Sequence, residues 1–299
     1  MDRTKFTLAT IHTVHGPQAA VGVRGAYFLL SALSADFRDT SVNNLFQSWD
    51  VHFPKLQALA SQITAGAEVI ALENPKLLTP IQYPEKLLAV GANYSGHLAE
   101  MGLKVEKWES MPFFMRPPST SLVGPGETVH IPRSTKQFDW ECELAIVVGK
   151  KLRHATRSEA AAAIAGYTIG LDLSCRDLIP APNELKIDLM RGKAQDTMAP
   201  CGPHIVPAQF VNNVDDLRIT LSVNGRPVMD ASTNQMLYKC DEILSNISEY
   251  MTLLPGDIVF TGSPSGSAGV HGNCWLQPGD IIKANIQDVG ELEVRMRHD

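Results

Sequence analysis

The sequence lacks long hydrophobic runs and any excess of positive charge. No apolar run approaches the roughly 20 residues that a membrane-spanning helix needs, and the opening residues MDRTKFTLAT contain no hydrophobic signal-peptide core. The formal net charge of −6 argues against a general binder of nucleic acid or anionic membranes. We therefore expect a cytoplasmic protein that binds neither nucleic acid nor membrane.

Cysteine is scarce, and its spacing argues against two kinds of site. The chain has five cysteines, an odd number, with no C-x-x-C pair. This pattern fits neither a disulfide framework nor a zinc site, and it is typical of small buried thiols in a reducing compartment. A catalytic cysteine would need a neighbouring base, and the sequence identifies none. The cysteines are Cys142, Cys175, Cys201, Cys240 and Cys274.

The first 80 residues predict a small accessory α/β domain. KFTLATI and QAAVGVRGAYFLL read as two strands joined by a His-Gly-Pro turn. A helix follows in PKLQALASQITAG, with Pro54 in its first turn and Gly66 as its C-cap. The proline-rich stretch ENPKLLTPIQYPEK then reads as an extended linker.

Residues 81–299 predict a second, catalytic domain that is mainly β. Short apolar runs alternate with turn signals such as Asn224-Gly225. Two helices interrupt them. Thr156-Arg157-Ser158-Glu159 is a capping box before the run AAAAIA, with Gly166 closing the helix, and DEILSNISEYM has helical apolar spacing. The fold class predicted for the whole chain is α+β, mainly β.

The segment DWECELAIVVGKK combines a buried strand with a row of acids. Leu144 to Val148 are apolar without interruption, whereas Asp139, Glu141 and Glu143 occupy alternate positions before and at the start of that run. Alternate side chains of a strand share one face. The sequence therefore predicts three carboxylates on one side of a strand that enters the core.

A further acid, Asp172, follows a β-like run from Tyr167 to Leu171, and acids that end neighbouring strands can converge. Clustered carboxylates repel one another unless a cation neutralises them. Ligation by oxygen alone suits Mg²⁺ or Mn²⁺ better than Zn²⁺. The ordinary alternative is a solvated strand face, which most E-x-E pairs occupy.

Six blocks of the sequence occur in an order that matches one family. They are GANYSGHLAEMG, DWECELAIVVGKK, GYTIGLDLSCRD, RGKAQDTMAPCGP, LSVNGRPV and LLPGDIVFTGSPSG. In that order they resemble the successive motifs of the fumarylacetoacetate hydrolase superfamily. The resemblance begins at about residue 85 and runs to the end of the chain, whereas residues 1–80 only weakly resemble the variable extra domain of longer members.

The resemblance implies a mixed β-roll or β-sandwich catalytic domain and a homodimer. It implies that Glu141, Glu143 and Asp172 hold one divalent ion, the same residues that the charge argument selects. Mg²⁺ or Mn²⁺ is the expected ion, and Ca²⁺ could take its place in a crystal. The ion would chelate a small 2-oxo or 1,3-dicarbonyl acid as substrate.

The resemblance also implies catalytic roles for three residues. His97 and Glu100 would belong to a lid in which the Glu orients the His, and the His removes a proton from water. Lys193 would stabilise the charge of a developing enolate. Without the resemblance, His97 and Glu100 would read as polar residues of a surface helix, and Lys193 as a solvated loop lysine.

Five residues are implied to contact or support the substrate. Thr261 and Gly262, in FTGSPSG, would grip a substrate carboxylate through hydroxyl and main-chain N–H groups. Arg176 would support the metal site or touch the substrate, although a structural salt bridge is the ordinary reading. Tyr94 lies in the lid motif. Arg116 stands where many members have lysine, which leaves the identity of the substrate open.

The function expected from these residues is hydrolysis of a carbon–carbon bond. The substrate would be an acylpyruvate-like or other 2,4-dioxo acid, cleaved by the His-Glu activated water with an enolate held by the metal. One alternative is an oxaloacetate-type decarboxylase on the same site. Another is an isomerase or hydratase of aromatic catabolism, and a non-enzymatic oxo-acid binding protein is the fourth.

Overall fold

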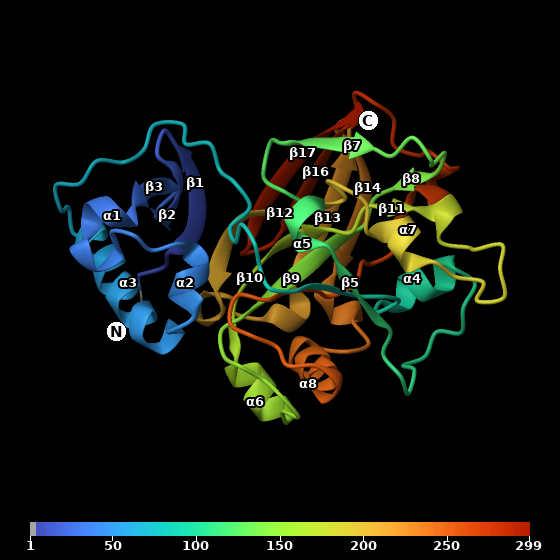
Figure 1. Cartoon of the computed structure of the whole chain (residues 1–299), viewed down its shortest axis with the longest axis horizontal. Coiled ribbons are helices and arrows are strands. Elements are labelled where there is room, and N and C mark those ends of the chain that lie inside the picture. Colours follow the sequence, from blue (N-terminus) through green and yellow to red (C-terminus); the bar gives the residue numbers. More distant parts are fainter. Residues whose placement is uncertain (1–3) are drawn as a thin grey trace.

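The structure is a computed structural model that describes residues 4–299. Figure 1 shows the N-terminal elements at one end of the molecule, beside a larger body in which two sheets face each other. The α+β, strand-rich fold class predicted from the sequence is confirmed. No helix within residues 4–299 is long and apolar enough to cross a membrane.

The ten-stranded sheet runs through both parts of the molecule, in the order β3-β2-β1-β12-β10-β9-β15-β4-β5, with β6 paired to β12. Its N-terminal strands are β1 (Thr7–Thr13), β2 (Gly16–Val23) and β3 (Ala26–Leu29). The others are β4 (Leu87–Val90), β5 (Phe113–Arg116), β6 (Leu122–Val123), β9 (Cys142–Val148), β10 (Ile164–Leu171), β12 (Ala199–Pro207) and β15 (Ile258–Phe260).

A five-stranded sheet packs against the middle of the large one, with β13, β16 and β17 contacting β9, β10 and β12. It consists of β7 (Thr128–Ile131), β13 (Arg218–Val223), β14 (Arg226–Ser232), β16 (Ile281–Ile286) and β17 (Gly290–His298). A short ribbon pairs β8 (Phe138–Asp139) with β11 (Ser174–Cys175). The α-helices are α1 (Leu30–Leu33), α2 (Val42–Phe46), α3 (Trp49–Thr64), α4 (Ser95–Glu100), α5 (Pro118–Ser121), α6 (Arg157–Ala162), α7 (Leu189–Lys193) and α8 (Cys240–Tyr250).

The N-terminal segment differs from its prediction in two places. QAAVGVRGAYFLL forms two strands, not one, because Arg24 and Gly25 both adopt positive φ angles, 51° and 84°, and make a tight hairpin turn. Helix α3 begins at Trp49, so Pro54 lies inside the helix and not in its first turn. The ring of Trp49 packs on Phe46 and Phe53, which explains the earlier start. Gly66 caps the helix as expected, donating its N–H to the Ile63 carbonyl.

Hydrogen bonds connect the two parts of the chain across the domain boundary predicted at residue 80. Strand β1 pairs with β12 through Leu8 and Ile205. The predicted linker lies along β1, where the Thr10 hydroxyl donates to the Pro80 carbonyl over 2.6 Å. The division into residues 1–80 and 81–299 therefore remains a prediction.

Strand β9 lies inside the large sheet, between β10 and β15, and all seven of its residues are buried. The buried strand predicted from its apolar run is confirmed. The strand does not extend back to Asp139, however. Asp139 belongs to β8, and Glu141 lies between the two strands, so the three acids do not share one face of a single continuous strand as predicted.

The second part of the chain confirms its two main helices. The Thr156–Glu159 capping box of α6 is fully formed, and α8 buries Ile243, Leu244 and Ile247. Gly166 does not close α6 but lies inside β10, where a Cβ atom would meet the Val206 carbonyl oxygen at 2.5 Å. Four of the five cysteines are buried as expected, whereas Cys274 is exposed.

Candidate active site

Two adjacent central strands bring three carboxylates together. Glu143 lies on β9, Glu141 immediately precedes that strand, and Asp172 follows β10. The register pairs Gly170 with Glu143, and the Asp172 N–H donates to the Glu141 carbonyl over 3.0 Å. One oxygen from each carboxylate lies within 4.8 Å of the others, and all three residues are buried. The structure therefore brings together the residues that the charge pattern selected.

The carboxylates are electrostatically unequal. Burial, reinforced by the neighbouring charge of Glu141, raises the pKa of Glu143 to about 8. Burial also opposes ionisation of Glu141, but Arg176 and Lys193 outweigh it and hold the pKa of Glu141 well below its usual value. Glu143 accepts a hydrogen bond from the Gly262 N–H. Of the three carboxylates, Glu143 is therefore the one least compensated by side-chain cations.

Lys193 supplies a cation at the centre of the triad. It ends helix α7 and is buried, so the expectation of a loop lysine is corrected. Its ammonium group donates to Glu141 Oε2 over 2.5 Å and to Asp172. Burial lowers the pKa of Lys193. The residue predicted to stabilise an enolate is thereby placed against two of the candidate metal ligands.

Arg176 and Asp139 form a second layer beside the triad. Arg176 donates from Nε to Asp139 Oδ2 over 2.7 Å and from Nη2 to Glu141 Oε1 over 2.5 Å. Asp139 also accepts the main-chain N–H groups of Trp140 and Ala268. Asp139 therefore orients Arg176, a role that sequence reasoning missed although the same acidic pattern contained this residue.

Arg116 contacts Asp172 in the interior of the protein. It is completely buried, donates to the Met198 carbonyl over 2.7 Å and forms an ion pair with Asp172. Substrate contact was expected of this residue, but all these partners belong to the protein. Arg116 positions Asp172 in this structure, and its contact with substrate remains a prediction.

Replacement of Arg116 by methionine is expected to lower the free energy of unfolding by about 3 kcal/mol. Asp172 would stay buried with one cation fewer, and removal of one partner from a buried pair costs ~3–5 kcal/mol, which Lys193 partly offsets. Urea denaturation of metal-free protein measures the change. Arg116→Lys, which keeps the charge, should lose less, and equal losses in both variants would contradict this account.

The predicted lid residues reach the triad. His97 is buried on helix α4, so the alternative of an exposed polar helix is wrong for it. His97 Nδ1 lies 3.1 Å from Glu100 Oε2, and Nε2 lies 3.3 Å from Glu141 Oε1. Glu100 also accepts the Gly266 N–H over 2.6 Å. Burial alone would lower the pKa of His97, but the hydrogen bonds that its ring donates to Glu100 and Glu141 raise it to about 9.

The residues expected to hold a substrate carboxylate contact the protein itself. The Thr261 hydroxyl donates to the Leu144 carbonyl over 2.9 Å, and the Gly262 N–H donates to Glu143. Gly262 has a φ of 92°, and a Cβ there would meet Asn93 Cβ at 2.8 Å. This turn therefore fixes Glu143, and its contact with substrate remains a prediction.

The segment that precedes helix α4 is attached to the same turn. Tyr94 is completely buried, and burial raises the pKa of its hydroxyl well above the usual value. Asn93 was not selected from the sequence, yet its amide donates to the carbonyls of Thr261 and Tyr238 over 2.7 and 3.0 Å. Its position beside Tyr94 in the motif was the available signal. Asn93 thus holds the segment before helix α4 against the turn that supports Glu143.

The donor set fits a hard divalent cation. Three buried carboxylates offer oxygen ligands alone, with no cysteine in the group and the His97 ring 3.3 Å from one of them. Mg²⁺ and Mn²⁺ prefer such ligands. The elevated pKa of Glu143 shows that burial and like charge disfavour its ionised form without further positive charge. These residues could therefore hold one metal ion.

Comparisons with known proteins give matches over most of the chain. Residues 86–297 match the family model described as fumarylacetoacetate (FAA) hydrolase C-terminal. The chain is 34% identical over 239 residues to a mitochondrial oxaloacetate tautomerase of Xenopus laevis, covering 79% of this chain and 73% of that protein.

Two solved structures extend the likeness to three dimensions. A fumarylacetoacetate hydrolase from Exiguobacterium antarcticum has a TM-score of 0.80 at 27% identity, covering 98% of this chain and 100% of that one. A fumarylpyruvate hydrolase from Pseudomonas aeruginosa, in complex with Mn²⁺ and pyruvate, has a TM-score of 0.66 at 29% identity. That match covers 75% of this chain and 92% of the other.

Proposed function

The chain belongs to the fumarylacetoacetate hydrolase family, and from that premise we propose that it is a divalent-metal-dependent enzyme acting on a small 2-oxo dicarboxylic acid. The proposed reaction is keto–enol tautomerisation of oxaloacetate. The observation that carries the proposal is the buried triad of Glu141, Glu143 and Asp172, with Lys193 and His97 both within contact of it. The similarity to an oxaloacetate tautomerase supports the choice of reaction.

Each side chain of the site has a part in this chemistry. Mg²⁺ or Mn²⁺, held by the three carboxylates, would polarise the 2-oxo group of the substrate. Lys193 is placed to offset negative charge on the enolate oxygen. His97 is oriented by Glu100 through Nδ1. Its Nε2, which lies 3.3 Å from Glu141 Oε1, would take a proton from carbon 3 of the substrate once a metal ion engages that carboxylate. Return of a proton to the enolate oxygen completes the tautomerisation.

Hydrolysis of a carbon–carbon bond is the second candidate. The same His97–Glu100 pair could take a proton from water, and the water would attack the distal carbonyl of a 2,4-dioxo acid. Lys193 would then stabilise the enolate that leaves. Similarity to fumarylacetoacetate and fumarylpyruvate hydrolases favours this reaction. Decarboxylation of oxaloacetate and isomerisation in aromatic catabolism use the same electron sink and remain alternatives.

The direct test follows enol-oxaloacetate and an acylpyruvate in parallel with Mg²⁺ or Mn²⁺ present. We expect the protein to accelerate loss of the enol absorbance beyond the rate with metal alone, without release of CO₂. We also expect it to speed exchange of the carbon 3 hydrogens with D₂O, as seen by NMR. No acceleration of either process, with cleavage of the acylpyruvate instead, would replace tautomerisation by hydrolysis.

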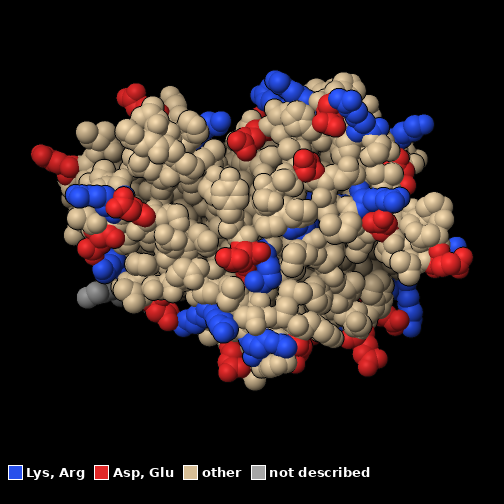
Figure 2. All heavy atoms as spheres, viewed as in Figure 1, with Lys and Arg blue, Asp and Glu red and all other residues tan. Residues whose placement is uncertain are grey.

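The assembly and the compartment remain proposals. We propose a homodimer, as the family resemblance implies, and sedimentation velocity would measure it. A cytoplasmic location is the reading of the sequence, whereas the relative from Xenopus laevis is named mitochondrial. Both charge signs are interspersed over the face in Figure 2, so this view shows no broad basic patch. That distribution on this face is consistent with a small-molecule substrate.

A further inference from the structure

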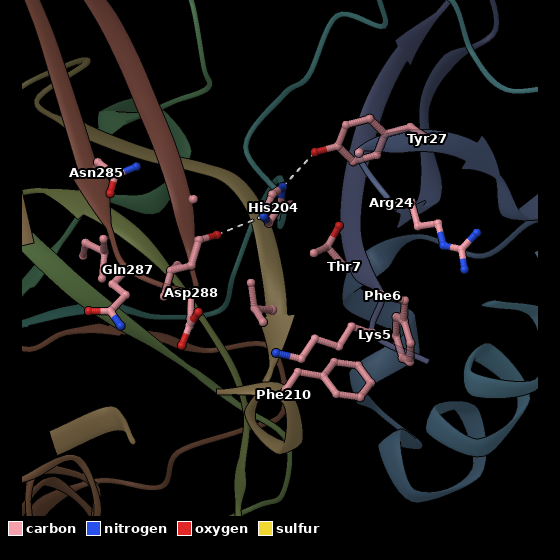
Figure 3. A pocket seen from close by; sticks show the side chains of 16 residues that line it. Lys5, Phe6, Thr7, Arg24, Tyr27, His204, Phe210, Asn285, Gln287 and Asp288 are labelled. Atoms are coloured by element: carbon pink, nitrogen blue, oxygen red, sulfur yellow. Dashed lines mark hydrogen bonds between the residues drawn. The ribbon is translucent and has the colours of Figure 1, made fainter. Parts of the chain in front are cut away.

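A cavity of about 420 Å³ lies where the N-terminal strands meet β12 and the turn between β16 and β17. Figure 3 shows its side chains converging from these separate segments. Cavities of roughly 300–1,000 Å³ commonly hold small molecules. The cavity shares no lining residue with the triad, the lid or Lys193. It therefore calls for an explanation independent of the proposed reaction.

One part of the cavity lining is apolar and well packed. Phe6 and Phe210 are buried and meet edge to face, with their ring centroids 5.2 Å apart. Val206, Ile286 and Val289 are buried beside the same space. Aromatic and aliphatic walls of this kind bind the hydrocarbon part of a ligand through the hydrophobic effect.

Another part of the lining is polar but uncharged near neutral pH. His204 Nε2 lies 2.9 Å from the Val289 carbonyl, which can only accept, so Nε2 carries the proton. Nδ1 must then accept the hydrogen bond from the Tyr27 hydroxyl, which lies 2.7 Å away. Burial lowers the pKa of His204 to about 4 and raises that of Tyr27 to about 12. The pair offers the Tyr27 oxygen as a fixed polar contact.

Three charged residues line the cavity. Within the described range of 4–299, Lys5, Arg24 and Asp288 form no ion pair, although all three line the cavity. In Figure 3 the Lys5 ammonium group extends into the space between the two sides of the cavity, while Arg24 lies on the edge and points outward. Two cations against one carboxylate leave an excess of positive charge.

We propose that this cavity binds a small organic anion, a carboxylate attached to an apolar or aromatic body. The body would lie on Phe6 and Phe210, and the carboxylate would pair with Lys5, with Arg24 contributing from the edge. Asp288 opposes the anion and limits its affinity. This ligand site is distinct from the site that processes the substrate.

The probe is 3-phenylpropanoate, compared by isothermal titration calorimetry with its neutral isostere 3-phenylpropanamide. We expect saturable binding of the acid, with the amide bound roughly tenfold more weakly or worse, the loss expected for one charge-assisted contact. Lys5→Ala should weaken binding of the acid to a similar extent. Asp288→Asn should strengthen it, because the variant removes the opposing charge.

Two control variants test whether binding of the acid depends on surface charge in general or on the carboxylate triad. Lys151→Ala removes another exposed lysine, one that does not line this cavity, and should leave the affinity unchanged. Glu143→Gln alters the triad and should also leave it unchanged. The proposal is overturned if the wild-type protein shows no saturable binding of the acid, or if the amide binds as well. It is also overturned if Lys5→Ala binds like wild type, or if Asp288→Asn binds more weakly.

Discussion

Glu143→Gln is expected to reduce turnover roughly a thousandfold or more and to weaken binding of Mg²⁺ or Mn²⁺. The amide keeps the shape of the side chain and can still accept the Gly262 N–H, but it removes one of three anionic ligands. Loss of several kcal/mol of charge stabilisation from a bound metal corresponds to ~10³ in rate. Titration calorimetry with the metal ion and steady-state rates at saturating metal measure the two effects.

The loss should not come from unfolding. Burial and the charge of Glu141 raise the pKa of Glu143 to about 8, so near neutral pH the metal-free protein mainly holds the uncharged acid. A neutral amide then replaces a neutral acid, and the stability of metal-free protein is not expected to fall. Glu73→Gln, at an exposed position in the N-terminal third of the chain, is the matched control and should retain full activity. Chelation of the wild-type protein with EDTA should abolish turnover, and added Mg²⁺ or Mn²⁺ should restore it. Full turnover by metal-depleted protein would refute the metal site.

Local sequence signals predicted much of the fold where they determine structure directly. The apolar run at Leu144–Val148 specified a buried strand, and the capping box at Thr156 specified where α6 begins. The errors arose where distant packing decided the outcome. Gly166 resembles a helix C-cap in the sequence, but its lack of a Cβ is used in β10 for close approach to Val206. Pro54 is tolerated inside α3, where aromatic packing adds a turn before it.

The convergence of the acidic residues in the candidate site could be predicted from the sequence. The placement of its cationic side chains was harder to predict. Glu143 and Asp172 follow from strand alternation and strand ends, which are local properties. The direction of a long side chain depends on partners distant in sequence. Arg116 ends β5, but its buried contacts come from Met198 and Asp172, more than fifty residues away. The cavity lined by Phe6 and Phe210 could not be predicted from the sequence for the same reason, because its lining comes from several separate segments.

His97→Ala is expected to cut oxaloacetate tautomerisation by roughly 10²–10⁴, the usual contribution of a positioned acid–base group. Exchange of the carbon 3 hydrogens with D₂O should fall in parallel, because the same proton transfer is lost. Glu100→Gln should have a smaller effect, since Glu100 acts through His97 and its amide can still accept from Gly266. Any hydrolysis of an acylpyruvate should also fall in both variants.

Lys193→Met distinguishes the role of Lys193, which would stabilise the enolate, from that of His97, which would remove the proton. It removes the cation that would offset the enolate, so every reaction that passes through an enolate should slow, including any decarboxylation of oxaloacetate. Decarboxylation should fall less in His97→Ala, because cleavage there needs the electron sink and no base. Lys136→Met, at an exposed lysine, serves as the control. If His97→Ala keeps wild-type exchange at carbon 3 while Lys193→Met loses it, then His97 is not the base, because proton removal would continue without it.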